Sequence, residues 1–232
     1  MVRLLVRLSV LGLLLAPGGC DRTPKSPSAA PLPTTAPAAL FAGDSLDGWS
    51  VSDWSDLRRP QQVAGEAWKV DGGVLSGLGR RTWLFSEGEY ADFVLSFDVR
   101  ISRGANGGVG LRFPPEGDPA YTGMELQVVD HEVYYGGRSR PEQRTGSIYD
   151  EIAADDAPAP VERWTAWQIT CKGPRVTVVI DGRTALDADL SRETKARQQK
   201  GPPLAQRPLR GRIGFQNLSK RITFRNLRIR KL

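Results

Sequence analysis

The sequence has a single histidine, two cysteines and two methionines among 232 residues. One histidine excludes the zinc sites that use several histidines, and leaves only sites built from carboxylate, amide and single-histidine ligands. Two cysteines cannot form the framework of a disulfide-stabilised domain. Apolar residues at 40% and charged residues at 25% are close to the averages of globular proteins, so a chain that is disordered throughout is also excluded.

Long apolar runs are lacking as well. The run Leu8–Leu15, which follows two arginines, is well below the ~20 residues that a membrane-spanning helix needs. A positive start, a short apolar run and small residues are typical of an export signal, so we expect a signal peptide at residues 1–19. Cys20 follows directly, which resembles the lipobox of bacterial lipoproteins, although Pro17 stands where leucine is usual. We expect Cys20 to be lipidated and to anchor an exported protein to the membrane of the cell envelope; the alternative is a secreted or periplasmic protein.

The next segment differs in composition from the rest of the chain. Residues 20–39 contain five prolines among serine, threonine and alanine, and show no hydrophobic period. Such a stretch is extended and polyproline-like, and suits a tether between a membrane and a domain. We expect the folded domain at residues 40–232, a length that can bury roughly 70% of the unfolded surface in one core.

From residue 40 onward, apolar residues follow a two-residue period between turns. Phe93–Ile101 alternates apolar and polar residues throughout. Asp71-Gly72 and Asp181-Gly182 each lie between two such runs, and Asp-Gly is a strong hairpin signal. No window shows a convincing helical period. Strands at a spacing of ~8–12 residues predict an all-β, antiparallel sandwich or barrel.

Three features depart from simple alternation. The even-numbered apolar residues that end at Phe224 give way to odd-numbered ones from Leu227, so we expect a β-bulge near Arg225-Asn226. Ser191–Leu209 is polar, and we expect a long exposed loop there. Cys171 lies in a strand-like run, which favours a buried free thiol over a nucleophile.

Positive charge is concentrated near the C-terminus, where residues 207–232 hold nine bases and no acid. These bases alternate along strand-like runs. Nucleic-acid-binding proteins instead carry them on a recognition helix or among exposed aromatic side chains. We therefore expect the solvated face of a sheet and no nucleic-acid partner.

Most catalytic templates are missing. The sequence has no Gly-x-Ser-x-Gly elbow, no Walker loop and no His-Glu-x-x-His motif. Gly104–Gly110 is rich in glycine, but it leads into a predicted strand and not into the helix that a phosphate loop requires. We interpret it as a turn and a flat sheet surface that a ligand or second backbone approaches closely.

The most informative stretch begins at Tyr121. On a strand there, Glu125 and Gln127 share one face, and an acid on that face is costly in a core but natural in a polar groove. Arg112 lies on the polar face of the preceding predicted strand. If the two strands are neighbours, they form one polar patch made of Asn106, Arg112, Glu125, Gln127, Asp130 and His131. The alternative is a solvated sheet face with an ordinary Arg–Glu pair.

Eight short motifs follow one another along the domain: Leu40–Trp49, Tyr90–Leu95, Gly104–Arg112, Tyr121–Asp130, Thr145–Tyr149, Asp187–Leu190, Gly214–Asn217 and Phe224–Ile229. In this order they resemble the 3-keto-disaccharide hydrolase family. The resemblance implies a concanavalin-like jelly-roll β-sandwich and export to the bacterial envelope. It also implies action on oxidised (3-keto) glycosides that a partner sugar dehydrogenase produces.

The resemblance further implies a reaction that starts beside a ketone. A ketone at C3 acidifies the C2 proton, whose removal gives an enolate that expels the C1 substituent by β-elimination, and water then adds to the enone. Such a reaction needs a base and an electrophile for the enolate oxygen. We assign Glu125 as the base, Asp130 or His131 as the second acid/base, and Arg112, with Asn106 or a divalent cation, to the enolate. The groups that we expect to hold the sugar are Asn106, Gln127, Tyr149, Gln216 and Asn217.

Two other classes of function stay open at this point. A non-catalytic carbohydrate-binding module of the cell envelope would use the same sandwich face, with stacking aromatic residues and no base. A protein-interaction or structural role would need neither a base nor a sugar site.

Overall fold

The computed structural model describes residues 36–232, except residues 42, 61–63, 156 and 196–199. The strands are β1 (Ala38–Ala39), β2 (Trp49–Asp53), β3 (Asp56–Pro60), β4 (Trp68–Asp71), β5 (Val74–Gly77), β6 (Thr82–Ser86), β7 (Phe93–Ile101), β8 (Asn106–Phe113), β9 (Met124–Val129), β10 (Thr165–Lys172), β11 (Arg175–Ile180), β12 (Arg183–Asp189), β13 (Arg212–Ser219) and β14 (Ile222–Lys231). The α-helices are one turn long: α1 (Ala64–Ala67), α2 (Pro119–Thr122) and α3 (His131–Tyr134). Short 3₁₀ turns lie at Pro141–Gln143, Leu190–Arg192 and Leu204–Gln206.

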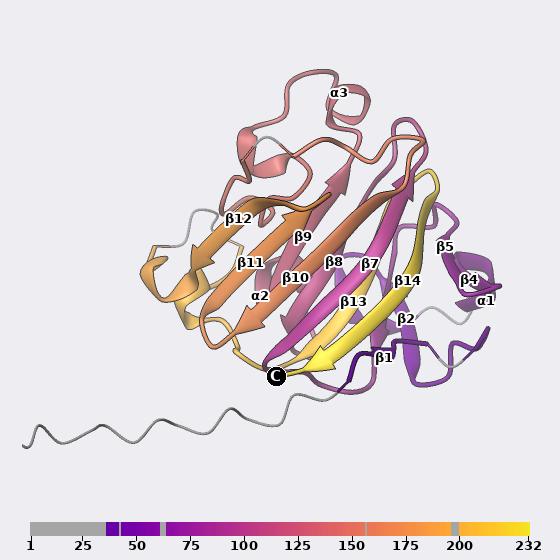
Figure 1. The fold of residues 1–232 in the computed structure, drawn as a ribbon, viewed down its shortest axis with the longest axis horizontal. Helices are drawn as coiled ribbons and strands as arrows, with labels where there is room; N and C mark the ends of the chain where they lie inside the picture. Colours follow the sequence, from indigo (N-terminus) through magenta and orange to yellow (C-terminus); the bar gives the residue numbers. More distant parts are fainter. Residues whose placement is uncertain (1–35, 42, 61–63, 156, 196–199) are drawn as a thin grey trace, which may run out of the picture. The chain divides into compact units, whose positions relative to one another are not determined.

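The strands form two antiparallel sheets, which confirms the predicted jelly-roll β-sandwich. In the described residues, the larger sheet has eight strands in the order β12-β11-β10-β7-β14-β5-β4, with β1 paired to β14. The smaller sheet has six strands in the order β3-β2-β6-β13-β8-β9. Figure 1 looks onto the larger sheet, with β13, β8 and β9 of the smaller sheet behind it.

The core lies between the two sheets. In β7 the odd-numbered residues from Phe93 to Ile101 are buried, and the even-numbered ones are more exposed, as the alternation predicts. Trp68, Leu75, Phe215 and similar side chains from both sheets complete the core. Cys171 is a buried free thiol, as predicted, and burial raises its pKa to about 12.

Both predicted hairpins are confirmed. Asp71 ends β4 and pairs with Val74 of β5, with Gly72 and Gly73 between them, and Asp181-Gly182 joins β11 to β12. Asp181 and Gly182 have φ of 48° and 78°, the left-handed pair that a type I′ turn requires. The turn twists in the same sense as the flanking strands, so it fixes their register.

The predicted bulge in β14 is confirmed as well. The register of β14 against β7 shifts between Arg225 and Arg228, and Asn226 has a φ of 55°. The extra residue changes the phase of the strand, so that Phe224 and Leu227 both contact the core.

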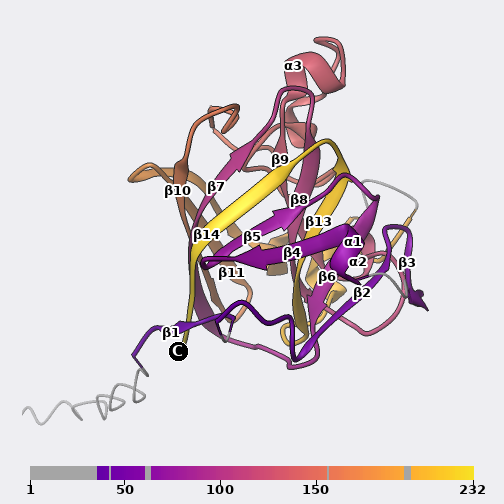
Figure 2. The same ribbon diagram turned by 90° about the vertical axis from the view of Figure 1, so that its right-hand side faces the viewer.

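The folded part of the chain begins slightly before the predicted boundary at residue 40. Ala38 and Ala39 form β1, which pairs with β14 near the C-terminus (Figure 2). The predicted signal peptide at residues 1–19, Cys20 and most of the tether lie outside the described residues. Within the described part of the chain, no helix has the length and apolar character needed to cross a membrane.

The expected exposed loop at Ser191–Leu209 is only partly a loop. It contains two 3₁₀ turns, and its Leu204 and Arg207 are buried. The segment packs inward because the Arg207 guanidinium group pairs with Glu151 and donates to the backbone carbonyls of Ala120 and Gly123. No local sequence pattern signals those partners.

Candidate functional site

A cavity of about 420 Å³ lies on the face of the smaller sheet that points away from the core. This volume is within the ~300–1,000 Å³ typical of small-molecule sites. Its floor comes from β8, β9 and β13, and its walls come from loops around α2, α3, residue 149 and residue 200. The lining residues are Trp54, Ser55, Arg81, Asn106, Asp118, Ala120, Tyr121, Glu125, Gln127, Tyr134, Tyr135, Tyr149, Lys200, Gln216 and Leu218.

Strand alternation places the polar floor. In β9, Met124, Leu126 and Val128 belong to the core, so Glu125 and Gln127 face the cavity. Gln216 of β13 and Asn106 of β8 face it by the same rule, beside core residues of their own strands. The predicted grouping of Asn106, Glu125 and Gln127 is therefore confirmed, and Gln216 joins them.

Gly108 makes room for the acid on this floor. It pairs with Gln127 across β8 and β9. A Cβ atom at this position would lie 2.6 Å from Cγ and 2.7 Å from Cδ of Glu125. The glycine-rich run thus provides the close approach that the sequence predicted, although what approaches Gly108 is the neighbouring glutamate side chain.

The Glu125 carboxyl group has lost almost all contact with water, since the residue is 3% exposed. Burial raises its pKa well above the ordinary value, and the nearby carboxylates of Asp118 and Asp150 raise it further. Asp118 also lines the cavity, and burial raises its pKa to about 6. The cavity therefore contains two carboxyl groups whose pKa values burial raises above the ordinary range.

The amide groups on the floor are poised for a ligand. Asn106 Oδ1 and Gln216 Oε1 are buried and have no hydrogen-bond partner among the described residues. Gln127 Oε1 accepts from the Val128 N–H at 3.1 Å, which leaves the Gln127 NH₂ group free to donate. Buried polar groups are rarely left unpaired, so this set of acceptors and donors fits the hydroxyl groups of a polyol.

Tyrosines and one lysine form a wall of the cavity. The Tyr121 hydroxyl donates to Asp150 Oδ2 at 3.2 Å, and Lys200 Nζ donates to the Tyr121 oxygen at 3.3 Å and lies over its ring. Tyr135 and Tyr149 also line the cavity. Burial raises the pKa of both these tyrosines, so they stay protonated and can donate.

A buried arginine joins the wall segments. Arg207 Nη1 donates to the carbonyls of Ala120 (3.1 Å) and Gly123 (2.9 Å), which flank Tyr121 in sequence. Arg207 Nε donates to Pro202 O at 2.9 Å, and the guanidinium group pairs with Glu151. Arg207 therefore ties together the segments that carry Tyr121, Tyr149 and Lys200.

Arg112 does not lie in this cavity, so its predicted position is wrong. Arg112 has a φ of 53° and is the extra residue of a β-bulge, because Arg212 pairs with Phe113 while Ile213 pairs with Leu111. The bulge turns the side chain away from the polar face. Arg112 is fully buried and donates to Ala91 O (2.7 Å), Gly173 O (2.6 Å) and Asp92 Oδ1 (3.1 Å).

Three other predicted site residues also lie elsewhere. Asp130 caps α3 and accepts from the Gly104 N–H at 2.8 Å, and His131 lies 3.3 Å from Glu132; neither lines the described cavity. Asn217 has the opposite parity to Gln216. Its amide contacts the backbone, accepting from Gly79 and donating to Lys220 O at 2.9 Å. Tyr149, in contrast, lines the cavity as predicted.

Sequence reasoning missed several lining residues. Asp118 precedes Pro119 and caps α2, accepting from the Ala120 N–H at 3.0 Å, which is a recognisable helix start. Tyr121 is the first residue of the Tyr121–Asp130 motif, in which only Glu125, Gln127 and Asp130 are predicted to belong to the site. Lys200 comes from a distant segment, and no local pattern could have placed it.

The divalent cation left open by the sequence finds no ligand set in the described residues. No group of three or more His, Cys, Asp or Glu side chains there is arranged to hold a metal ion. Glu125 and Asp118 share the cavity, but the one histidine contacts Glu132.

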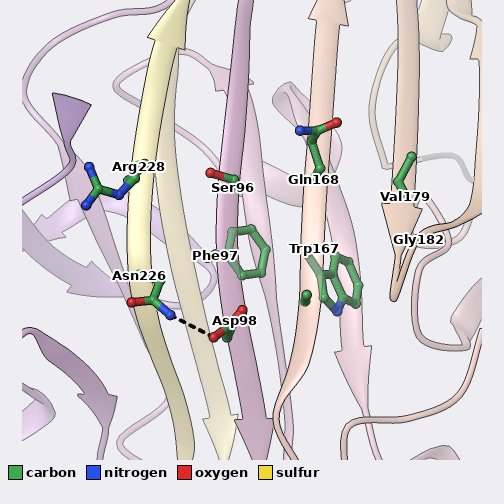
Figure 3. A pocket seen from close by; sticks show the side chains of 10 residues that line it. Ser96, Phe97, Asp98, Trp167, Gln168, Val179, Gly182, Asn226 and Arg228 are labelled. Atoms are coloured by element: carbon green, nitrogen blue, oxygen red, sulfur yellow. Dashed lines mark hydrogen bonds between the residues drawn. The ribbon is translucent and has the colours of Figure 1, made fainter. Parts of the chain in front are cut away.

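A second depression, of about 430 Å³, lies on the outer face of the larger sheet (Figure 3). Arg228, Ser96 and Gln168 lie side by side across β14, β7 and β10. The negative charge of Asp98 is balanced there, because its carboxylate accepts hydrogen bonds from Arg225 (3.0 Å) and Asn226 (2.8 Å). This face is a solvated sheet surface, and the acid that lines the depression is paired.

Comparison with known families identifies the domain. The sequence pattern of the 3-keto-alpha-glucoside-1,2-lyase-like domain matches residues 36–230. The chain belongs to the 3-keto-disaccharide hydrolase family. As a member of it, the chain is a carbohydrate-active domain. No protein of curated function matches this member of the family.

Solved structures agree with the family. One, from Parabacteroides distasonis, is named provisionally as a glycosyl hydrolase; it is 25% identical, has a TM-score of 0.70, and the match covers 85% of this chain and all of that one. A second protein from the same organism, with the same provisional name, is 23% identical with a TM-score of 0.67, covering 83% of this chain and 92% of its own. The second likeness shows the fold.

Proposed function

We propose that this chain cleaves 3-keto-glycosides by removing the C2 proton and eliminating the C1 substituent, with hydration of the enone completing a net hydrolysis. The observation that carries the proposal is the desolvated Glu125 carboxyl group on the floor of a cavity with unpaired amide oxygens. Family membership supports the substrate class.

In the proposed reaction, the Glu125 carboxylate takes the proton from C2, and the electrons of the C–H bond form the enolate with the C3 carbonyl. The enolate then re-forms the ketone as C1=C2 becomes a double bond and the C1–O bond breaks. The departing oxygen takes a proton from Asp118, which replaces Asp130 and His131 as our second acid/base. A base with a raised pKa is a stronger proton acceptor, which suits a weakly acidic carbon.

Other cavity residues stabilise and orient the sugar in this proposal. The Gln127 NH₂ group and the Lys200 ammonium group donate to the developing enolate oxygen, in place of Arg112. Asn106 and Gln216 accept from sugar hydroxyls, and Tyr149 donates to them. A partner sugar dehydrogenase would supply the C3 ketone.

The test follows exchange of the C2 proton of a 3-keto-glucoside in D₂O. Glu125→Gln keeps the shape of the side chain and removes the base, so exchange should fall by roughly 10²–10⁴-fold while sugar binding persists. Unchanged exchange in Glu125→Gln would transfer the base role to Asp118. A wild-type protein that binds the sugar but neither exchanges nor cleaves it would be a carbohydrate-binding module, which the tyrosine wall also suits.

We also propose that the protein is exported and lipid-anchored through Cys20. This proposal rests on the order of charge, apolar run and small residues in the leader. The wild type should partition into detergent and Cys20→Ala into the aqueous phase. Aqueous partitioning of both would support a secreted protein instead.

A further inference from the structure

Trp54 and Arg81 are among the lining residues that have no role in the proposed reaction. Trp54 follows β2 and Arg81 precedes β6, two strands that pair with each other. The Arg81 guanidinium carbon lies 4.8 Å from the centre of the Trp54 ring. A cation stacked on an aromatic ring in this way forms one flat surface.

This pair lies across the sheet from the acid on β9. Going from β6 to β9 takes three strand steps, through β13 and β8, which is roughly 14 Å at ~4.8 Å per step. Both ends line the same cavity. A substrate whose C2 lies at Glu125 can therefore extend along the sheet toward Arg81.

The backbone holds the pair in place. Arg81 has a φ of 54°, a conformation that side chains larger than glycine rarely adopt. The Trp54 N–H donates to Arg81 O at 3.1 Å, and Trp54 O accepts from the Trp83 indole at 3.0 Å. Trp54 also packs on a buried cluster that contains Leu57, Trp83 and Phe113. The platform is thus supported from below by rigid aromatic packing.

The charge of Arg81 has no acidic partner among the described residues. Its neighbour Arg80 lies 3.7 Å from Glu66, whereas no ion pair involves Arg81 there. Asp53, which adjoins Trp54 in sequence, accepts from the amide (2.9 Å) and the hydroxyl of Ser55. With one face on the indole, the guanidinium group keeps its N–H edges available, and these match a carboxylate in a bidentate arrangement.

We propose that Trp54 and Arg81 form the subsite for the group on C1, and that this group is an aromatic or similarly flat aglycone that carries a carboxylate. The flat part would lie against Trp54 and the anion would pair with Arg81. The inference rests on the proposed function, because it needs the sugar ring at Glu125.

The experiment compares two 3-keto-glucosides that differ only in charge, one with a 4-carboxyphenyl and one with a 4-carbamoylphenyl aglycone. The wild type should prefer the carboxylate in kcat/KM by roughly ten- to hundredfold, the range of a charge-assisted hydrogen bond. The preference should shrink as salt rises, since the arginine is exposed. Arg81→Gln should abolish the preference, because kcat/KM for the carboxylate substrate should fall to about the value for the carbamoyl substrate.

Two further variants make the result specific. Arg80→Gln removes the neighbouring charge and should keep the preference. Arg81→Asn supplies a residue that tolerates the left-handed backbone, and it should match Arg81→Gln if the loss comes from charge and not from misfolding. Equal kcat/KM for both substrates in the wild type, or an unchanged preference in both Arg81 variants, would overturn the subsite.

Binding separates this inference from the proposed reaction. The same two aglycones can be titrated by calorimetry on glucosides that lack the C3 ketone, because their C2 proton is not acidified and they cannot undergo the elimination. A carboxylate preference that depends on Arg81, in a protein without turnover, would keep the subsite and reject the reaction. Turnover without that preference would keep the reaction and reject the subsite.

Discussion

The outer faces of the two sheets both carry polar residues and a depression of similar volume, yet only one has the properties of a site. On the larger sheet, Asp98 is paired with Arg225 and Asn226, and Gln168 and Arg228 are exposed to water. On the smaller sheet, Glu125, Gln127 and Gln216 are at most 3% exposed, although they point away from the core.

The difference comes from the loops. Water solvates the larger sheet directly, so its polar groups are satisfied at little cost. Segments around Tyr121, Tyr149 and Lys200 cover the smaller sheet and remove water from its acids and amides without supplying partners for all of them. Polarity on a sheet face is common, whereas desolvated and incompletely paired polarity indicates a ligand.

Among the substitutions that test this contrast, Gly108→Ala should have the largest effect on activity. The new methyl group would overlap the Glu125 side chain, with Cβ only 2.6 Å from Cγ, so the carboxyl group must move. A displacement of ~1 Å at a reacting group can cost about 10²-fold in rate, and we expect a loss of at least that size in kcat/KM. The control on the solvated face is Ala166→Val, which should keep activity within about twofold. Wild-type activity in Gly108→Ala would show that the position of the Glu125 carboxyl group is unimportant.

Substituting the two buried arginines can distinguish an effect on stability from an effect on the cavity. Arg207 ties together the loops over the smaller sheet, while Arg112 ties backbone carbonyls away from it. Arg207 and Glu151 form a buried ion pair, and removing one partner of such a pair costs about 3–5 kcal/mol. Arg112→Met takes the donor away from the carbonyls of Ala91 and Gly173, so it and Arg207→Met should both lower the free energy of unfolding in urea.

Only Arg207→Met should also weaken binding of a 3-keto-glucoside, because only Arg207 holds the wall that carries Tyr121 and Lys200. Calorimetry of both folded variants measures this. Equal losses of sugar affinity in the two variants would mean that Arg207 acts through stability alone.

The structure also shows how far the sequence could predict this site. The inward rows, both hairpins and the bulge in β14 follow from parity and turn residues, which are local signals. The same parity correctly groups Glu125, Gln127 and Asn106. Strand alternation also excludes Asn217 from this group, because Asn217 lies next to Gln216 on β13 and therefore points to the opposite face.

The wrong prediction for Arg112 has a different cause. Its bulge is visible only in the pairing of β8 with β13, where Phe113 lies opposite Arg212, and nothing in the Gly104–Arg112 motif signals it. Lys200 and Arg207 reach the site through contacts with residues that are distant in sequence. Lys200 contacts Tyr121, 79 residues earlier, and Arg207 contacts Ala120, 87 residues earlier. Local patterns cannot supply such contacts.

The pH dependence gives a smaller and more specific effect. Burial raises the pKa of Asp118 from its ordinary 3.8 to about 6, so the folded protein binds a proton there that the unfolded chain has released. This contribution to stability is present below pH 3.8 and is lost as pH rises through about 6. Asp118→Asn keeps the cap on α2 and removes the titration. Between pH 4 and pH 7, the stability of Asp118→Asn should therefore fall less than that of the wild type, as thermal unfolding can measure. The pH profile of kcat/KM for this variant should also lack the change near pH 6 that the wild type shows. A wild-type limb near pH 6 that persists in Asp118→Asn would assign that titration to another group.

The smallest effects should come from the outer face of the larger sheet. Arg228 and Gln168 are exposed, and the nearby acid Asp98 is already paired with Arg225 and Asn226. Surface substitutions of this kind usually change stability by less than about 0.5 kcal/mol. Arg228→Gln combined with Gln168→Ala should therefore leave unfolding in urea, kcat/KM and sugar affinity at wild-type levels. Affinity is the decisive measurement, because a sugar-binding surface needs donors and acceptors that face the ligand, and on this face the two substituted side chains would supply them. A tenfold loss of affinity with unchanged turnover would show that the larger sheet carries a second sugar site and that solvation does not distinguish the two faces.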